Sequence, residues 1–393
     1  MKGSLLTLGL LLLFVVEILR VYLIMPFPGS QQSDTIDWAY WLHNNIWWIR
    51  IIGLLLIVYP VVQVMRNAKR WKKLLLVVGL ALYGVVFYCF NFRFLADKMF
   101  YQPTYTRFAD ADHNKVAADK LVIGVVINGE AKAYPIQMIG YHHQVRDTIA
   151  NTLVMVIYCT VCRTGRVFSP VVDGRLETFR LVGMDHFNAM FEDAATKSWW
   201  RQATGVAVAG PSKGKKLTEI PSTQLSLKAW LQEYPGAVVF QGDTAFNKQY
   251  EHLAAFDNGT IGSGLEKRDS GSWQMKSWIV GMVQGEQAKA YDWNELVDKK
   301  IIQDSLPGLP VLLVLEKDNA SFHVWNRRVK DNTLQFATHN INYLKDLNTL
   351  SVWDMTGLCI DGPFKGEQLL PLQAYQEFWH SWSTFHPGTA KFP

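Results

Sequence analysis

Three long apolar runs near the N-terminus leave this part of the chain few ways to fold. They cover residues 5–24, 46–65 and 74–91, and each approaches the roughly 20 residues that cross a bilayer as an α-helix. A helix is required there because hydrocarbon offers the backbone no hydrogen-bond partners. The sequence therefore predicts three transmembrane helices within residues 1–93, with the lipid bilayer as their partner.

Two charged residues, Glu17 and Arg20, interrupt the first run. They lie three residues apart on one face of a helix, so they could pair inside a helix bundle. A cleaved signal peptide is the alternative interpretation of this run. Its length, its internal charges and its lack of a small-residue cleavage site favour a helix that is retained.

The two connections between the runs differ in charge and indicate an orientation. The second connection, 66–73, carries five Lys and Arg residues, whereas the first, 27–45, holds two Asp and neither Lys nor Arg. The positive-inside rule puts the basic connection in the cytoplasm. We therefore expect an anchor in the inner (cytoplasmic) membrane and a C-terminal domain outside the cytoplasm. Because five basic residues lie in that connection, the net charge of +5 requires no nucleic-acid partner.

The rest of the chain contains one sequence pattern twice. Residues 131–134, Ala-Lys-Ala-Tyr, return 157 positions later as residues 288–291, and the Gly-Pro of residues 210–211 returns 152 positions later. Short β-rich runs and hairpin turns such as Asn128-Gly129 dominate the pattern. The sequence therefore predicts an α+β, β-dominated fold in which an internal duplication produces two similar lobes.

The repeat and the apolar runs together divide the chain into four segments. The membrane anchor takes residues 1–93, and the first repeat lobe takes residues 94–240. A polar, glycine-rich stretch at 241–274 is typical of a connection or surface insertion. The second repeat lobe then takes residues 275–393.

Only the first copy carries a pair of cysteines, Cys159 and Cys162. The second copy has Glu316 and Asn319 at the matching positions. Where two halves share a fold, a chemically distinctive difference indicates a site. The pair lies between two predicted strands, which is the layout of a metal-binding knuckle. In thioredoxin-like enzymes the same spacing instead opens a helix, whose dipole lowers the pKa of the attacking thiol.

Copper is the metal that these residues favour. Two thiolates with an imidazole suit a soft ion, and copper is the soft ion expected outside the cytoplasm. Zinc is less favoured, because a closed zinc site needs four Cys or His ligands and the chain has no second Cys-x-x-Cys. His142 is the third candidate ligand, since the second copy has Lys299 in its place. Met184 and His186 are weaker candidate donors, and methionine is also a common packing residue.

Further motifs extend along the C-terminal part of the chain. They are the hairpin at 128–135, His142 with Asp147, Tyr158-Cys159-x-x-Cys162, Trp200, Gly210-Pro211 and His386-Pro387-Gly388. In these motifs, residues 100–393 resemble the bacterial family catalogued as domain of unknown function 3179, whose name implies no established activity. Members usually have an acidic residue after the motif histidine and a glycine after the second cysteine. Here those positions are His143 and Arg163, which leaves the ligand number and the charge of the site open.

Three functions remain compatible with these residues. The first is a membrane-tethered metal-site protein that holds copper for storage, delivery or redox chemistry, together with a metal-donor or redox partner protein. The second is an extracytoplasmic thiol–disulfide oxidoreductase, in which Cys159 and Cys162 react. The third is a non-catalytic binding module in which the two cysteines form a structural disulfide. Whether the protein is an enzyme therefore stays open.

Overall fold

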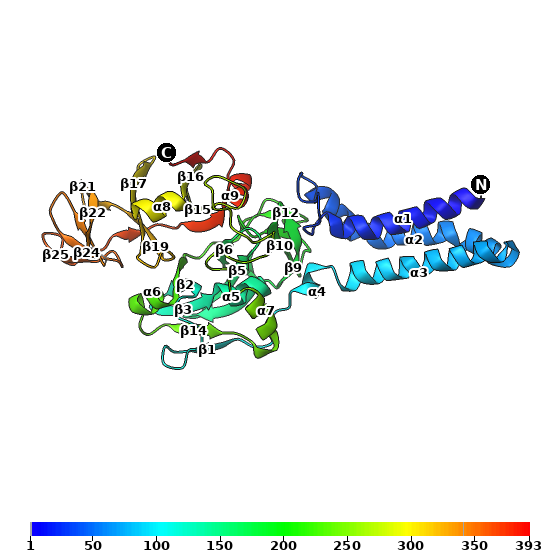
Figure 1. Cartoon of the computed structure of the whole chain (residues 1–393), viewed down its shortest axis with the longest axis horizontal. Coiled ribbons are helices and arrows are strands. Elements are labelled where there is room, and N and C mark those ends of the chain that lie inside the picture. The colour runs from blue at the N-terminus through cyan, green and yellow to red at the C-terminus, as the bar shows by residue number, and fades with distance from the viewer. Residues whose placement is uncertain (1, 341) are drawn as a thin grey trace. The chain divides into compact units, whose positions relative to one another are not determined.

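The computed structural model describes residues 2–340 and 342–393 and divides the chain into two compact units. One unit combines Met1–Tyr101 with Glu177–Lys216, and the other combines Gln102–Leu176 with Leu217–Pro393. Strands take 33% of the residues and helices 30%, and three long helices precede the strand-rich part (Figure 1). The predicted α+β class is therefore confirmed. The boundaries between the two units fall inside the predicted first lobe, residues 94–240, because residues 177–216 group with the helices.

The first unit begins with helices α1 (Lys2–Tyr22), α2 (Ile36–Asn67) and α3 (Arg70–Phe92), which lie side by side in Figure 1. All three are long and apolar enough to cross a membrane. Two glycines bring α1 and α2 close together. A Cβ atom on Gly9 would lie 2.5 Å from Ile57, and one on Gly53 would lie 2.8 Å from Leu13. Small residues at such a contact let the two backbones approach closely inside a bilayer.

A buried polar cluster joins the three helices. Glu17 of α1 accepts two hydrogen bonds of 2.7 Å from Arg50 of α2 and one of 2.8 Å from Asn91 of α3. Arg20, the expected partner of Glu17, instead donates to Asn91 at 2.8 Å. Tyr83 adds a longer bond of 3.3 Å to Glu17. The cluster holds one carboxylate and two guanidinium groups, so Glu17 offsets part of the positive charge. The neutral side chains of α3 add hydrogen bonds that lipid could not supply.

A small antiparallel sheet completes the first unit. Its strands follow one another in space as they do in sequence, and are β9 (Phe179–Asp185), β10 (Asn188–Asp193), β11 (Trp199–Arg201) and β12 (Ala207–Ala209). The ring of Tyr40 in α2 packs edge-on against Trp199, 5.1 Å between centroids. The backbone N–H of Met184 donates to the carbonyl of Ile24 at 2.7 Å. The membrane helices are therefore packed against a folded sheet.

The second unit starts with the predicted hairpin at Asn128-Gly129. Strands β2 (Leu121–Ile127) and β3 (Glu130–Pro135) pair through this turn, with β13 (Thr223–Ser226) antiparallel to β2 and β14 (Val238–Gln241) parallel to β3. Strand β1 (Arg107–Ala109) pairs with β14. Helix α6 (Leu227–Glu233) lays Trp230 over Gly124, where a Cβ atom would lie 2.1 Å from the indole. Glycine is required there by the tryptophan that covers the sheet.

The cysteine pair belongs to a neighbouring three-stranded sheet in this unit. Helix α5 (Ile136–His142) leads from β3 into β4 (Gln144–Ile149), which pairs with β5 (Thr152–Cys159), and β5 pairs with β6 (Thr164–Phe168). The cysteines thus lie at and after the end of β5, in the turn to β6. Asp173-Gly174 forms a further hairpin turn, between β7 (Val171–Val172) and β8 (Arg175–Leu176).

The later part of the second unit repeats this pairing scheme. In one sheet, β15 (Trp278–Gln284) pairs with β16 (Gln287–Asp292), β27 (Tyr375–Phe378) is antiparallel to β15, and β28 (Ala390–Lys391) is parallel to β16. Trp382 of α9 (Trp379–Phe385) covers Gly281, as Trp230 covers Gly124. A duplication would produce this correspondence, and the duplication itself stays a prediction.

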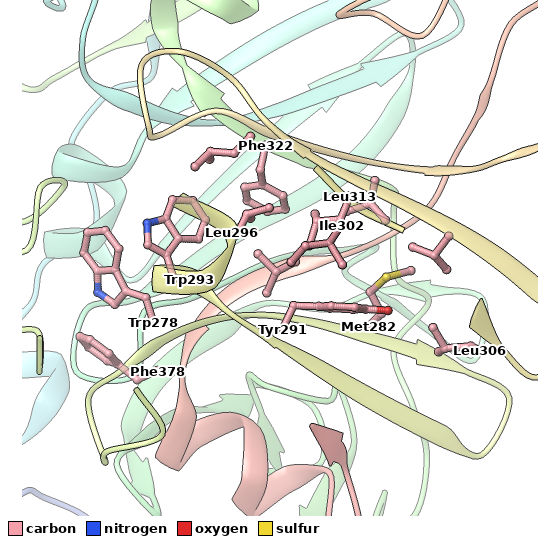
Figure 2. Close-up of a cluster of buried hydrophobic side chains, with 14 residues drawn as sticks. Trp278, Met282, Tyr291, Trp293, Leu296, Ile302, Leu306, Leu313, Phe322 and Phe378 are labelled. Carbon is pink, nitrogen blue, oxygen red and sulfur yellow. The ribbon is translucent and has the colours of Figure 1, made fainter. Parts of the chain in front are cut away.

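A hydrophobic cluster fills the space between two sheets of this part (Figure 2). Trp278, Trp293 and Phe378 gather at one end of the cluster, and Met282, Tyr291 and Leu306 lie at the other. The elements that surround it include α8 (Trp293–Lys299), β17 (Ile301–Leu306), β18 (Leu309–Leu315), β19 (Phe322–Asn326) and β26 (Leu370–Pro371).

The remaining elements are short. A last antiparallel sheet contains β22 (Phe336–Asn340), β23 (Tyr343–Asp346), β24 (Val352–Asp354) and β25 (Cys359–Asp361). The others are α4 (Ala96–Met99), η1 (Thr244–Phe246), α7 (Asn247–His252), β20 (Arg328–Val329) and β21 (Asn332–Thr333). Between α7 and β15 the chain runs through turns and loop, in line with its glycine-rich, polar composition.

Candidate functional site

The two cysteines lie in one tight turn and have no solvent exposure. Cys159 is the last residue of β5, and Cys162 lies two residues before β6. Both side chains are 0% exposed, and both are thiols that are not joined in a disulfide. The Cys162 Sγ donates a weak hydrogen bond of 3.8 Å to the carbonyl of Cys159. The local sequence thus brings two soft donors together in the interior of the second unit.

Burial controls the protonation of this pair. Burial raises the pKa of the Cys162 thiol well above its usual value, and the adjacent Cys159 raises it further. A thiol with a raised pKa stays protonated at neutral pH, so it is a poor nucleophile. Thiol exchange also requires an exposed sulfur. Cys162 therefore lacks both the exposure and the lowered pKa that a disulfide-exchange nucleophile needs.

An ammonium group lies against the same turn. The Nζ of Lys276 donates a hydrogen bond to the carbonyl of Val161, which lies between the two cysteines. Burial lowers the pKa of Lys276 to about 8, while the nearby Cys162 and Cys159 act in the opposite direction. An ammonium in this position would stabilise thiolates if the cysteines lost their protons.

Backbone and aromatic contacts fix the second half of the turn. The N–H of Phe378 donates to the carbonyl of Cys162 at 3.0 Å. Arg163 has φ 53°, the left-handed region that glycine adopts freely and other residues enter at a cost of about 1 kcal/mol. Its guanidinium is stacked 3.8 Å from the ring of Trp278, and its Nε donates to Gln376 at 2.8 Å. These contacts offset the conformational cost of placing arginine in the left-handed region.

A buried ion pair supports the turn from the β6 side. Arg166 pairs with Glu377 of β27, and the exposed fraction of each side chain is 2% or less. The guanidinium also lies 3.3 Å from the ring centroid of Tyr375. Ser381 donates to Glu377 at 3.2 Å and lies 3.3 Å from the hydroxyl of Thr164. A polar network therefore connects the strand after the cysteines to the later part of the unit.

His142, the predicted third ligand, lies in an aromatic environment. It is fully buried at the end of α5, its Nε2 lies 2.6 Å from the hydroxyl of Tyr250, and its ring contacts that of Phe246. In the part of the chain that the structure describes, no three His, Cys, Asp or Glu side chains come together as a group that could hold a metal ion. The structure thus brings Cys159 and Cys162 together but does not add His142 to form such a group.

The following residue, His143, is the histidine bonded to the cysteine strand. Its carbonyl accepts from the N–H of Tyr158 at 3.1 Å, and its Nδ1 lies 3.1 Å from the carbonyl of Tyr158. Burial lowers the pKa of His143 to about 4, so the imidazole is neutral at physiological pH. The sequence indicated His143 only as a departure from the related family. The pairing of Gln144 with Ile157 in β4 and β5 explains its position, because it sets His143 opposite Tyr158.

Met184 and His186 belong to the other compact unit. Met184 lies in β9, and His186 follows that strand. The Nδ1 of His186 lies 2.6 Å from the carboxylate of Asp185, and this hydrogen bond raises the pKa of His186. The two weaker candidate donors are therefore held in a different structural unit from the cysteine pair.

Comparison with known proteins identifies most of the chain. The family described as "Protein of unknown function (DUF3179)" matches residues 100–389. A search of curated proteins and a search of solved structures gave no match.

Proposed function

Because the chain belongs to the family described as Protein of unknown function (DUF3179), whose description names no activity, we propose a function from the site alone: Cys159 and Cys162 bind one copper(I) ion. The observation that carries this proposal is the pair of buried thiols in one turn, with the Lys276 ammonium bonded to that turn. Thiolates select soft ions such as copper(I). Two of them can satisfy this monovalent ion, so a third ligand is not needed.

Ligand number favours copper(I) over zinc. Each cysteine must lose its proton to become a ligand, and two thiolates with one copper(I) carry a net charge of −1. The ammonium of Lys276 offsets this charge from its position against the turn, and the carboxylate of Glu266 accepts from the Thr160 hydroxyl in the same turn. Zinc would lack the further ligands of a closed tetrahedral site.

The two alternative functions receive less support from the same geometry. A thiol–disulfide oxidoreductase would need a sulfur that a partner disulfide can reach, whereas both cysteines are fully buried. A structural disulfide is chemically compatible with the proximity of the two thiols. It would not, however, account for an ammonium held against the turn.

We further propose that the strand-rich part lies outside the cytoplasm, on the grounds of the basic connection between α2 and α3. Alkaline phosphatase, which folds only outside the cytoplasm, is expected to be active when fused after Pro393. A green fluorescent protein fused at the same position is expected to be dark, because it does not become fluorescent after export through the Sec pathway. Fusions at Ala68 serve as the control and should behave in the opposite way. Fluorescence at Pro393 together with inactive phosphatase would overturn the orientation.

The copper proposal predicts that each chain binds one copper(I) ion. The measurement is a titration of the full-length protein in detergent and without oxygen, in competition with a coloured chelator of known affinity. Cys159→Ser/Cys162→Ser should abolish this binding, because both ligands are lost. Lys276→Met should weaken it by roughly tenfold or more, about 1.4 kcal/mol, because the compensating charge is removed. Cys359→Ser is the matched control, since Cys359 is buried in β25 and its Sγ bonds to the carbonyl of Asp361. The control should bind copper like the wild type.

His142→Ala separates a two-ligand from a three-ligand site. If the two thiolates are the only ligands, His142→Ala should bind copper(I) with the affinity of the wild type. A weaker affinity would show that the His142 imidazole is a third ligand. If the double cysteine variant binds copper as the wild type does, the metal proposal fails. Disulfide exchange catalysed by the wild type and lost in that variant would support the oxidoreductase instead.

A further inference from the structure

A cavity of the second unit lies beside Arg163, the residue that follows the cysteine pair. Its volume is about 410 Å³. Two tryptophans of the hydrophobic cluster in Figure 2, Trp278 and Trp293, contribute to its wall. Three basic side chains, Lys120, Arg163 and Arg268, also line it. Three aspartates, Asp119, Asp257 and Asp318, line it as well, so the cavity combines apolar walls with side chains of both charges.

Arg163 and Arg268 share one aromatic ring. The centre of the Arg163 guanidinium lies 3.8 Å from the ring centroid of Trp278, and that of Arg268 lies 4.2 Å from it. Burial lowers the pKa of Arg268, and the charge of Arg163 lowers it further. Two like charges on one ring repel each other, so this arrangement is costly unless a negative charge is nearby.

Neither guanidinium has a carboxylate partner among the residues that the structure describes. Arg163 donates to neutral acceptors, the side chain of Gln376 and the carbonyls of Phe256 and Asp257. Arg268 donates to the amide oxygen of Asn294 at 2.5 Å. Buried cations in proteins are normally paired with anions, because an unpaired buried charge is expensive. Asp257 acts electrostatically on Arg163, and Asp292 on Arg268, but neither guanidinium is held by a direct ion pair within the described residues. The two guanidinium groups therefore keep hydrogen-bond donors that a ligand anion could engage.

The aspartates of the cavity equal its basic side chains in number, but none forms an ion pair with Arg163 or Arg268 in the part of the chain that the structure describes. Asp257 acts electrostatically on Arg163, and burial raises the pKa of its carboxyl, which weakens it as a counterion. One of its oxygens accepts from the N–H of Leu121 at 3.0 Å, and the other has no hydrogen-bond partner. The carboxylate of Asp318 is occupied by Ser321 and by the N–H of Ala320. Two buried donors of the lining, Arg268 Nε and Trp278 Nε1, also lack acceptors.

We propose that this cavity binds a small oxyanion, with a carboxylate or phosphate group held by Arg268. Arg268 is the arginine that can touch the ligand, because its side chain is partly exposed whereas Arg163 is fully buried. Arg163 adds a second positive charge beside Trp278. The indoles of Trp278 and Trp293 shield the ion pair between Arg268 and the oxyanion from water. The planar guanidinium fork matches the two oxygens of a carboxylate or phosphate. This site is separate from the proposed copper site, and neither depends on the other.

The test uses the full-length protein in detergent, with calorimetric titration and thermal unfolding in inorganic phosphate, in succinate and in sodium chloride of equal ionic strength. Saturable binding of phosphate or of succinate, with a matching rise in unfolding temperature, is the expected result. Phosphate alone would identify a phosphate ligand, and succinate alone a carboxylate. Binding of neither beyond the effect of chloride would overturn the proposal.

Arg268→Gln should weaken the binding by at least tenfold, and Lys267→Gln, which removes a charge from the exposed neighbour, is the matched control. Arg268→Lys keeps the charge but loses the fork, so it should also bind more weakly. Equal affinity in Arg268→Gln and the wild type would contradict the assignment. Cys159→Ser/Cys162→Ser should bind the oxyanion as the wild type does, so failure of the copper proposal would leave this result untouched.

Discussion

Glu377→Ala is expected to lower the free energy of unfolding by about 3–5 kcal/mol, because it leaves the Arg166 guanidinium buried without its main carboxylate. Both side chains of this pair are almost completely shielded from water. The substitution also removes the acceptor of the Ser381 hydroxyl. Unfolding of the full-length protein by denaturant in detergent measures the loss.

Glu219 provides the matched control for this prediction. It lies 3.6 Å from the same guanidinium, but its side chain is 29% exposed. Partly solvated ion pairs contribute little, so Glu219→Ala should cost no more than about 1 kcal/mol. Arg166→Met/Glu377→Leu should recover much of the stability lost in Glu377→Ala, because an apolar pair leaves no isolated charge. Equal losses in Glu377→Ala and Glu219→Ala would show that burial does not decide the strength of this pair.

Glu17→Ala should destabilise the helix bundle by about 3 kcal/mol, the cost of a charged side chain left without a partner among membrane helices. The change removes the carboxylate that accepts hydrogen bonds from Arg50, Asn91 and Tyr83. Two guanidinium groups then remain in the cluster without a negative charge. Unfolding in mixed micelles with a rising fraction of dodecyl sulfate, followed by circular dichroism, measures the effect.

Thr7→Ala is the control within the same helix. The Thr7 hydroxyl bonds only to the carbonyl of Gly3, on the exposed side of α1. Its loss should change the stability by less than about 0.5 kcal/mol. If Glu17→Ala unfolds like Thr7→Ala, the polar cluster does not hold the three helices together.

Local sequence signals predicted the elements well, but tertiary contacts decided their details. The apolar runs indicated three helices, yet α2 begins at Ile36, ten residues before its apolar run. The polar first turns of α2 pack against the small sheet through Tyr40 and Trp199, a contact between residues far apart in sequence. Likewise, the spacing of Glu17 and Arg20 suggested an ion pair between these two residues. The ion pair of Glu17 is instead with Arg50, a single charge within the second apolar run.

The site was predictable only where its residues are neighbours in the chain. Cys159 and Cys162 share a turn because a strand ends at one and another begins just after the other. Lys276 and Glu377 reach the same region from more than a hundred residues away, and no local pattern marks them. The position of His143 depends on one backbone angle. Its φ of 60° at the end of α5 turns the chain so that its Nδ1 lies 3.1 Å from the carbonyl of Tyr158 in the cysteine strand.

The sheet β9–β12 has a consequence for the order in which the protein can assemble during synthesis. The helices α1 to α3 leave the ribosome first, but their partner sheet follows only after residues 102–176. Tyr40 and the backbone carbonyl of Ile24 therefore lack their partners, Trp199 and Met184, until the sheet up to residue 216 has been synthesised. A fragment that starts after the helices would carry a sheet whose Trp199 has lost its covering ring. Shortened forms of this chain are thus expected to aggregate through that uncovered face rather than through the region of the cysteines.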